Sequence, residues 1–253
     1  MDTSIQPDWS GSLRRVADYI GSIVESDGVI APDSQPGLTV ATVLATRTAR
    51  NLRAIDLLAG AGFDIESHAI GRMILEDMFD LGYIAAGPEV RAQEWCDHCM
   101  VRRVFYARDS LTYDPQVHIS PEVVAANQRI SDEDLASGRS RRSRDWKLWP
   151  DVHRRERARQ AGLGGIYDDE YVFHCDLAHS SGLAIQLYST TADEDGRVPA
   201  LTPQGVIAAF AARSALDAAL RLCATARRLG LPWDHSDAWG LVDISLWSYG
   251  DDT

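Results

Sequence analysis

Apolar residues recur at helical spacing along most of the chain, which has neither an internal repeat nor the period-two alternation of strands. Ser10 and Thr202 suit helix N-caps, and Gly60 and Gly230 stand where helix-ending glycines are expected. The pattern predicts helices over about residues 10–24, 39–59, 64–84, 89–108, 167–179 and 202–230, and a short helix that opens at Pro121. We therefore expect an all-α protein, a bundle of antiparallel long helices with an irregular, arginine-rich insertion.

We expect residues 1–253 to form a single helical domain and to assemble as a homodimer. Its parts are an N-terminal helix and loop (1–37), core helices (39–108), a connector with a basic segment (109–165), core helices (166–230) and a tryptophan-rich tail (231–253). The tail should pack back on the bundle or on a second subunit.

The net charge of −12 is distributed unevenly. Residues 139–159 hold eight arginines and the only lysine of the chain against three acidic residues. This segment is either a solvated, partly helical connector or a docking site for nucleic acid or another acidic partner. In the second case, reversing the charges of Arg141, Arg142 and Arg154 should abolish binding of that partner.

The composition is that of an ordinary folded domain, with 45% hydrophobic residues. No apolar run approaches the roughly 20 residues that cross a bilayer, and the first residues lack the features of a secretory signal. We therefore expect a cytoplasmic protein that makes no contact with a membrane. Reduced thiols are then expected for the four cysteines, Cys96, Cys99, Cys175 and Cys223.

The helix expected at 64–84 has apolar side chains on every side, which is typical of a buried helix. Arg72 and Glu76 lie one turn apart on it, on the side shared by His68, Phe79 and Tyr83. An ion pair between them would be partly removed from water, and such pairs stabilise poorly because desolvation offsets the Coulomb gain. The pair is kept either for specificity of folding or for function.

The stretch "YVFHCDLAHSSG" combines several chemically versatile side chains in one short helix. Tyr167, Tyr171 and His174 follow one stripe of this helix, with Cys175 and His179 beside it. Asp176 precedes His179 by three residues and could orient its ring. The helix is either a polar seam in the core or part of a functional site.

Two motifs, "RMILEDMFDLGYI" and, far downstream, "YDDEYVFHCDLAHSSG", resemble a bacterial family known as domain of unknown function 5677. In that family an Arg-x-x-x-Glu helix is followed by a tyrosine-rich helix that ends in His-Ser or His-Pro. The likeness covers about residues 41–187 and implies a helical, cytoplasmic protein, without indicating a reaction. It picks out as site residues Arg72, Glu76, Tyr171, His179 and Ser180.

Inward-facing arginine and histidine are also distantly similar to those of the HEPN ribonucleases, in which the two residues of an Arg-x4–6-His motif cut RNA without a metal. Arg144 and His153 are separated by eight residues, outside that spacing. The resemblance therefore implies only general chemistry, in which Glu76 or His179 moves a proton and Arg72 holds an anionic group.

We favour a hydrolase or nuclease that acts on a small anionic substrate or nucleic acid, with no cofactor. His179 would be the general base, Glu76 its orienter and Arg72 the anion holder, with Tyr171 beside them. Arg72, His174 and Ser180 would bind the substrate. The rival hypothesis is a regulatory or interaction protein that docks an acidic partner through the basic segment.

A second alternative is a metal-dependent oxidase that binds iron, manganese or zinc. Asp176-x-x-His179 has the spacing by which di-iron bundles present two ligands on one helix face. Further ligands could come from Glu76, Asp80, Glu94 and His98.

The sequence "WCDHC" contains a single Cys-x-x-Cys pair, Cys96 and Cys99. It could bind a structural zinc together with Cys175, His174 or His98. We favour the simpler interpretation, in which these are core cysteines of a buried helix.

Overall fold

A computed structural model describes residues 8–26, 35–96, 98, 99, 121, 125, 152–179, 205–233 and 235–242. The chain divides into two compact units: unit 1 comprises residues 1–86 and 154–253, and unit 2 comprises residues 87–153. All regular structure among the described residues is helical, which confirms the all-α prediction. Within those residues, no helix has both the length and the apolar character needed to cross a bilayer.

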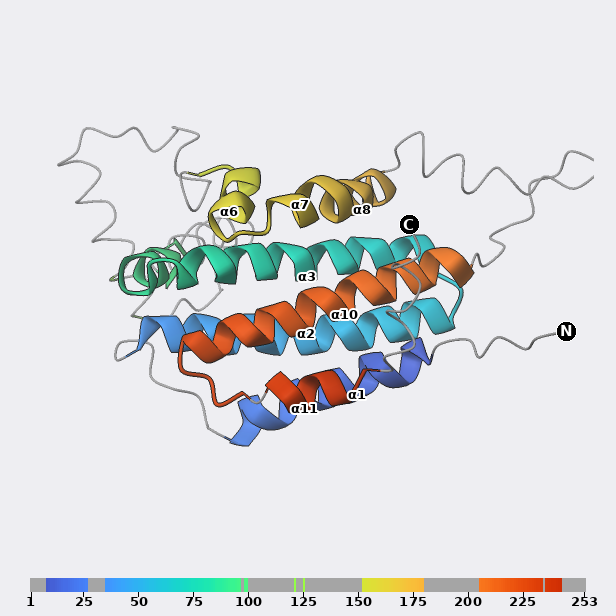
Figure 1. Cartoon of the computed structure of the whole chain (residues 1–253), viewed down its shortest axis with the longest axis horizontal. Helices are drawn as coiled ribbons and strands as arrows, with labels where there is room; N and C mark the ends of the chain where they lie inside the picture. The colour runs from blue at the N-terminus through green and yellow to red at the C-terminus, as the bar shows by residue number, and fades with distance from the viewer. Residues whose placement is uncertain are drawn as a thin grey trace, which may run out of the picture. The chain divides into compact units, whose positions relative to one another are not determined.

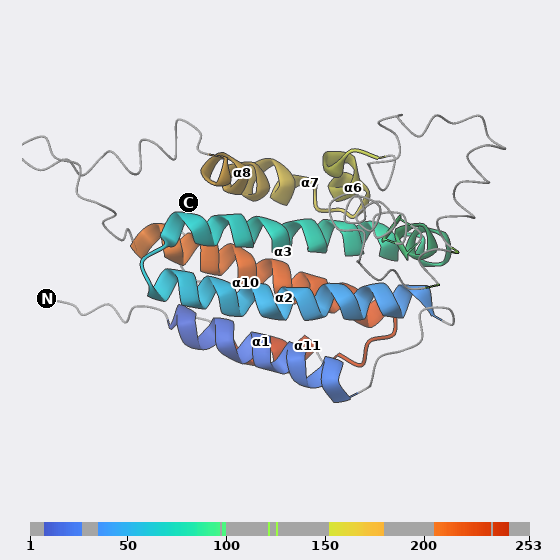
Figure 2. The same cartoon turned by 180° about the vertical axis from the view of Figure 1, so that it is seen from behind.

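Unit 1 is built on the long helices α1 (Trp9–Ser26), α2 (Pro36–Gly60), α3 (Asp64–Ala85) and α10 (Gly205–Arg228). Helices α1, α2 and α3 run antiparallel in chain order, as expected (Figure 2). Helix α10 packs against α2 and α3 and runs in the same direction as α3 (Figure 1). The first turns of α3 and α10 accordingly meet, with the His68 and Phe210 rings 6.0 Å apart.

Helix α3 is the centre of the core of unit 1, as its apolar pattern predicts. It contacts α2, α10 and the later helices α6 and α8. Its buried side chains therefore lie on several sides of the helix and include Ile74, Leu75, Met78, Phe79, Leu81 and Ile84. Helix α10 meets it with a row of buried alanines, whose small side chains allow the two backbones to approach closely.

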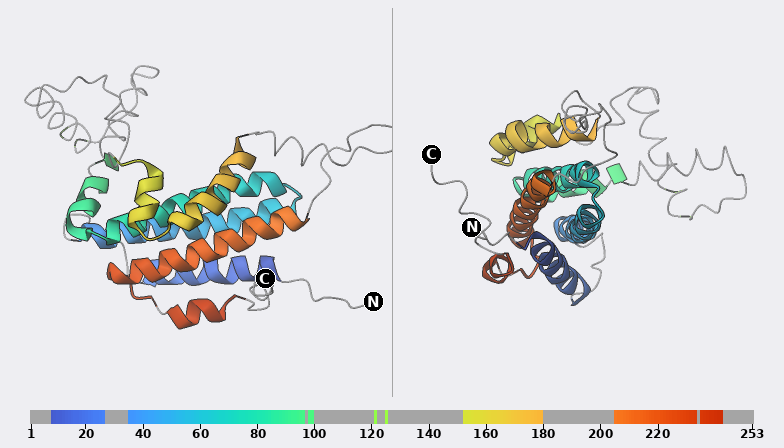
Figure 3. Two further views of the ribbon diagram at one scale, coloured as in Figure 1. Left: turned by 45° about the horizontal axis from the view of Figure 1, so that its top comes forward. Right: turned by 90° about the vertical axis from the view of Figure 1, so that its right-hand side faces the viewer.

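A second layer covers α3 on the side away from α1 (Figure 3). It consists of α6 (Arg154–Gln160), α7 (Gly164–Ile166), a single π-helical segment η2 (Tyr167–Tyr171) and α8 (Val172–Ala178). Residues 154–160 belong to the connector that we expected to be irregular and partly helical, and in the structure they form the helix α6. This charged segment can pack as a helix because three of its arginines form ion pairs with carboxylates on neighbouring elements.

Two glycines of α3 allow this layer to approach. A Cβ atom at Gly82 would lie 2.8 Å from the Ala161 Cβ, and one at Gly71 would lie 2.7 Å from the His174 Cε1. Carbon atoms that are not bonded to each other do not approach this closely. Any larger residue at Gly71 or Gly82 would therefore push the second layer away from α3.

Helix ends agree with the predicted ends to within a few residues, with one informative difference. The left-handed residue that ends α2 is Gly62 rather than Gly60, which still belongs to the helix. At Gly62, Gly162 and Gly230 the chain closes α2, α6 and α10 with the same pair of backbone hydrogen bonds, the Schellman motif.

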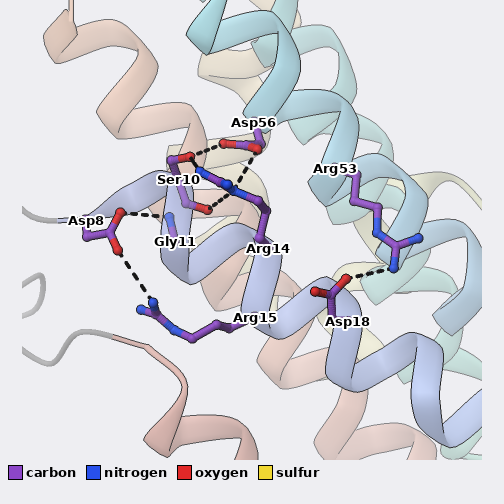
Figure 4. Close-up of polar contacts among 8 residues, drawn as sticks. All are labelled: Asp8, Ser10, Gly11, Arg14, Arg15, Asp18, Arg53 and Asp56. Carbon is purple, nitrogen blue, oxygen red and sulfur yellow. Dashed lines mark hydrogen bonds and ion pairs between the residues drawn. The ribbon is translucent and has the colours of Figure 1, made fainter.

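The described part of the tail packs on α1. Trp233 is buried with its ring 5.1 Å from that of Tyr19, and the Leu241 carbonyl accepts a 3.0 Å hydrogen bond from Arg15 after the short helix α11 (His235–Gly240). Polar contacts join α1 to α2, some of them exposed and some partly buried (Figure 4). Among them, Arg53 pairs with Asp18 at 2.8 Å.

In unit 2, residues 88–96, 98 and 99 are helical, as expected, and so are Pro121 and Ala125. The rest of the helix expected at 89–108 lies outside the described residues, as do residues 126–151 of the connector.

Candidate functional site

Five polar side chains from α3 and the second layer meet at one place in unit 1, which we call the Glu76 cluster: Arg72, Glu76, Arg154, Tyr171 and His179. The Glu76 Oε1 atom lies 3.0 Å from the Arg154 Nη1, accepts a 3.0 Å hydrogen bond from the Tyr171 hydroxyl, and lies 3.6 Å from the Arg72 Nε. Donors from α3, α6 and η2 thus converge on one carboxylate oxygen.

The cluster is partly withdrawn from water but reaches the surface. The side chain of Arg72 is 24% exposed, that of Glu76 18% and that of Arg154 35%. The expected ion pair between Arg72 and Glu76 is present. Charge-assisted hydrogen bonds at such a place are stronger than on an open surface, because less water competes for the donors.

His179, at the end of α8, joins the cluster through Arg72. Its Nε2 atom lies 2.6 Å from the Arg72 Nη1. A guanidinium group can only donate, so this nitrogen of His179 accepts, and the imidazole is neutral with its proton on Nδ1. The sequence analysis gave Glu76 the role of orienting His179, but in the structure Arg72 stands between the two.

Tyr171 is a neutral donor in this setting. Burial, together with a hydrogen bond to Cys175 and the nearby charge of Glu76, raises the pKa of its hydroxyl. For Arg154, burial acts to lower the pKa, but the Glu76 carboxylate and the Tyr171 oxygen outweigh it and the pKa is raised. The hydroxyl of Tyr171 also accepts a 2.5 Å hydrogen bond from the Arg154 Nη1.

The other arginines of α6 are also paired inside unit 1. Arg157 is buried and bonds Asp80, whose pKa is raised to about 6 by burial, against the effect of the arginines. Arg155 pairs with Asp168 at 3.0 Å, and Arg159 with Glu156 at 2.7 Å. The arginines at the described end of the basic segment therefore form ion pairs within unit 1. Reversing the charge of Arg154 would disrupt the Glu76 cluster itself.

His174, expected to bind substrate, belongs instead to a buried polar chain beneath α8. Its Nε2 lies 3.1 Å from the Ser214 Oγ, and its Nδ1 lies 3.1 Å from the His68 carbonyl oxygen and 3.2 Å from the His68 Nδ1. Burial and the neighbouring His68 lower the pKa of His174 to about 3, so it stays neutral.

The contact between Ser214 and His174 has the length of a nucleophile and base pair, but the surroundings do not suit catalysis. Ser214 is only 3% exposed, so a substrate in solution cannot reach its hydroxyl. The carboxylate of the group, that of Glu170, accepts a 2.6 Å hydrogen bond from the serine, whereas the Nδ1 atom of the histidine faces the His68 carbonyl and not a carboxylate that could orient it. We interpret this chain of hydrogen bonds as a buried polar network that holds α8 against α3 and α10.

Other predicted site residues make none of the contacts that define the Glu76 cluster. Asp176 is exposed on α8, and Glu94 and His98 belong to unit 2. Ser180 lies outside the described residues. Across the described ranges, no three His, Cys, Asp or Glu side chains gather where they could hold a metal ion. The four cysteines all lie among the described residues and form no disulfide bond, with Cys96 and Cys99 in unit 2 and Cys223 fully buried.

Sequence reasoning missed Arg154, the second guanidinium of the cluster. A signal was present in the spacing: Arg154 and Arg157 are three residues apart, and their partners Glu76 and Asp80 are four apart, so each pair lies on one helix face. The complementary charges could have suggested that the two helices pack together.

Arg144 and His153 are not the pair that comes nearest to the Arg-x4–6-His spacing. Six residues separate Arg91 from His98 and Arg228 from His235, so Arg-x6-His occurs twice in the chain.

A comparison with protein families matches residues 38–197 to a model described as "Family of unknown function (DUF5677)". The matched range contains all five residues of the Glu76 cluster, and the family is the one that the sequence motifs resemble. No curated protein and no solved structure matches the chain.

Proposed function

The chain belongs to DUF5677, a family of unknown function, and from the chemistry of the Glu76 cluster we propose that it is a hydrolase acting on a substrate with an anionic group. The observation that carries this proposal is the meeting of two guanidinium groups, those of Arg72 and Arg154, at one partly exposed carboxylate. With His179 neutral, the cluster has two positive charges and one negative charge.

Unused donors support an anion-binding role. The Nε atoms of Arg72 and Arg154 are buried and have no hydrogen-bond partner within the described part of the chain. A buried donor without a partner costs about 1–3 kcal/mol. A phosphate or carboxylate group suits such donors, because its oxygens match the planar fork of a guanidinium.

Binding of the anion would also prepare the base. When Arg72 turns to the substrate, it leaves the Nε2 of His179 with a free lone pair. That nitrogen then takes a proton from a water molecule, whose oxygen attacks the electrophilic phosphorus or carbonyl carbon, and it returns the proton to the leaving group. Arg154 and the Tyr171 hydroxyl would stabilise the charge that develops on the substrate oxygens.

The test is hydrolysis of 4-nitrophenyl phosphate, bis(4-nitrophenyl) phosphate and a fluorophore-labelled RNA oligonucleotide by the full chain. We expect turnover of at least one of them, and Arg72→Ala should lower kcat/KM for it by about 100-fold, the usual effect of removing one donor to a transition state. Arg53→Ala is the matched control, because Arg53 of α2 pairs with Asp18 of α1 (Figure 4), whereas the second layer covers α3 on the side away from α1 (Figure 3).

Two outcomes count against the proposal. Either the parent protein turns over none of the three compounds, or Arg72→Ala and Arg53→Ala retain the same kcat/KM.

We also propose that the protein acts in the cytoplasm as a homodimer. Light scattering on the purified protein tests the dimer.

A further inference from the structure

Glu76 is held in the way a bound ligand would be. Its contacts with Arg72, Arg154 and Tyr171 all involve the single oxygen Oε1. Each donor comes from a different element: Arg72 from α3, Arg154 from α6 and Tyr171 from η2. An anionic oxygen of a substrate would require the same donors, since the guanidinium groups and the hydroxyl are those best suited to bind it.

We infer that the Glu76 carboxylate is an internal stand-in for the anionic group of the substrate, which binds by displacing it. This inference rests on the proposed function and deepens it, because it names the substrate group: a terminal oxyanion, as in a phosphate or a carboxylate.

Electrostatics requires that Glu76 move. Two negative charges a few ångströms apart repel each other strongly where water is partly excluded, so Glu76 and a substrate oxyanion cannot share the same donors. The Glu76 side chain is flexible and 18% exposed, and it can therefore turn toward solvent when the donors are taken over.

The alternative role for Glu76 is that of a true member of the binding site. In that case its charge would help to hold Arg72 and Arg154 in place for the substrate, and removing the charge would weaken binding. The two roles predict opposite signs for the same substitution.

Calorimetric titration of the full chain with inorganic phosphate and, separately, with acetate distinguishes them. We expect Glu76→Gln to bind one of these anions about tenfold more tightly than the parent, because the internal competitor loses its charge. The Gln side chain keeps an oxygen that can accept from Arg154 and Tyr171, which favours an unchanged fold.

Asp18→Asn is the matched control. It removes the same charge from the exposed partner of Arg53 on α1 (Figure 4), on the opposite side of α3 from the second layer (Figure 3), and should leave the affinity unchanged. If Glu76→Gln unfolds, Glu76→Asp keeps the charge but shortens the side chain, and a smaller gain in affinity is then expected.

The outcomes separate the two ideas. Tighter binding by Glu76→Gln alone supports the inference, and the anion that gains identifies the substrate group. Equal or weaker binding by Glu76→Gln overturns the inference while anion binding by the parent leaves the proposed function standing. Binding of neither anion by either protein overturns both.

Discussion

At the scale of single residues, His174 is buried so completely that its imidazole cannot take up a proton in the folded protein. Burial and His68 lower its pKa to about 3, whereas the pKa of an unfolded histidine is about 6.5. Between these values the unfolded chain binds a proton that the folded chain does not. Lowering the pH through this window therefore favours unfolding, by up to about 1.4 kcal/mol per pH unit.

The direction of this pH dependence can be measured by urea unfolding of the parent and of His174→Gln at pH 7.5, 6 and 5. Buried Asp77 and Asp80 and half-buried Glu170 have raised pKa values, which oppose the effect of His174, but they are present in both proteins. We expect the parent to lose more stability than the variant below pH 6.5, by about 1 kcal/mol per pH unit. Parallel curves would show that His174 takes up a proton in the folded state.

At the scale of elements, Gly71 determines how closely α8 can approach α3. A Cβ atom there would lie 2.7 Å from the Cε1 of His174, a ring fixed by Ser214 and the His68 carbonyl. We expect Gly71→Ala to cost about 1–3 kcal/mol in the free energy of unfolding, the usual price of overpacking.

Gly60→Ala provides the control in chemical denaturation. Gly60 is also helical, but nothing lies within 4 Å of the position of a Cβ atom. Alanine is the better helix former, so this variant should gain up to about 1 kcal/mol. Loss of equal stability in both variants would exclude a steric role for Gly71.

Local patterns explain which elements and site residues could be predicted. Apolar periodicity and helix-ending glycines predict α1, α2, α3 and α10 because these signals act within a few residues. The pairing of Arg72 with Glu76 follows from their spacing of one helical turn. Arg154 could not be placed in the same way. A run of arginines usually marks an exposed surface, and only its partners on α3, distant in sequence, withdraw it from water.

The buried role of His174 agrees with one of the two alternatives that the sequence left open, a polar seam in the core, but the sequence could not decide between them. The stripe that it shares with Tyr171 suggests one common environment. In the structure the Tyr171 hydroxyl bonds the partly exposed Glu76. The ring of His174 instead lies against Gly71, where the lack of a side chain leaves room for it.

At the scale of the whole of unit 1, stability should be uneven. Helices α6 and α8 have seven residues each, whereas α3 has 22 and α10 has 24 and both lie in the core. Short helices are marginal without tertiary contacts, so the second layer should open before the bundle does.

Hydrogen exchange followed by mass spectrometry tests this order. Amides of residues 154–178 should exchange at a lower opening free energy than those of α3 and α10, and Gly71→Ala should lower it further. Equal protection of all these helices would indicate that the two layers unfold as one cooperative unit.

Unit 1 is made from two stretches of chain, and this has a consequence for the order of assembly during folding. The helices α1 to α3 follow one another closely, whereas Arg72 and His179 are 107 positions apart and Arg15 and Leu241 are 226 positions apart. Contacts between distant residues form slowly because a long loop must close first. A nascent chain that has completed α3 already holds Arg72 and Glu76, but the Glu76 cluster stays incomplete until residues 154–179 have been synthesised and have returned to α3.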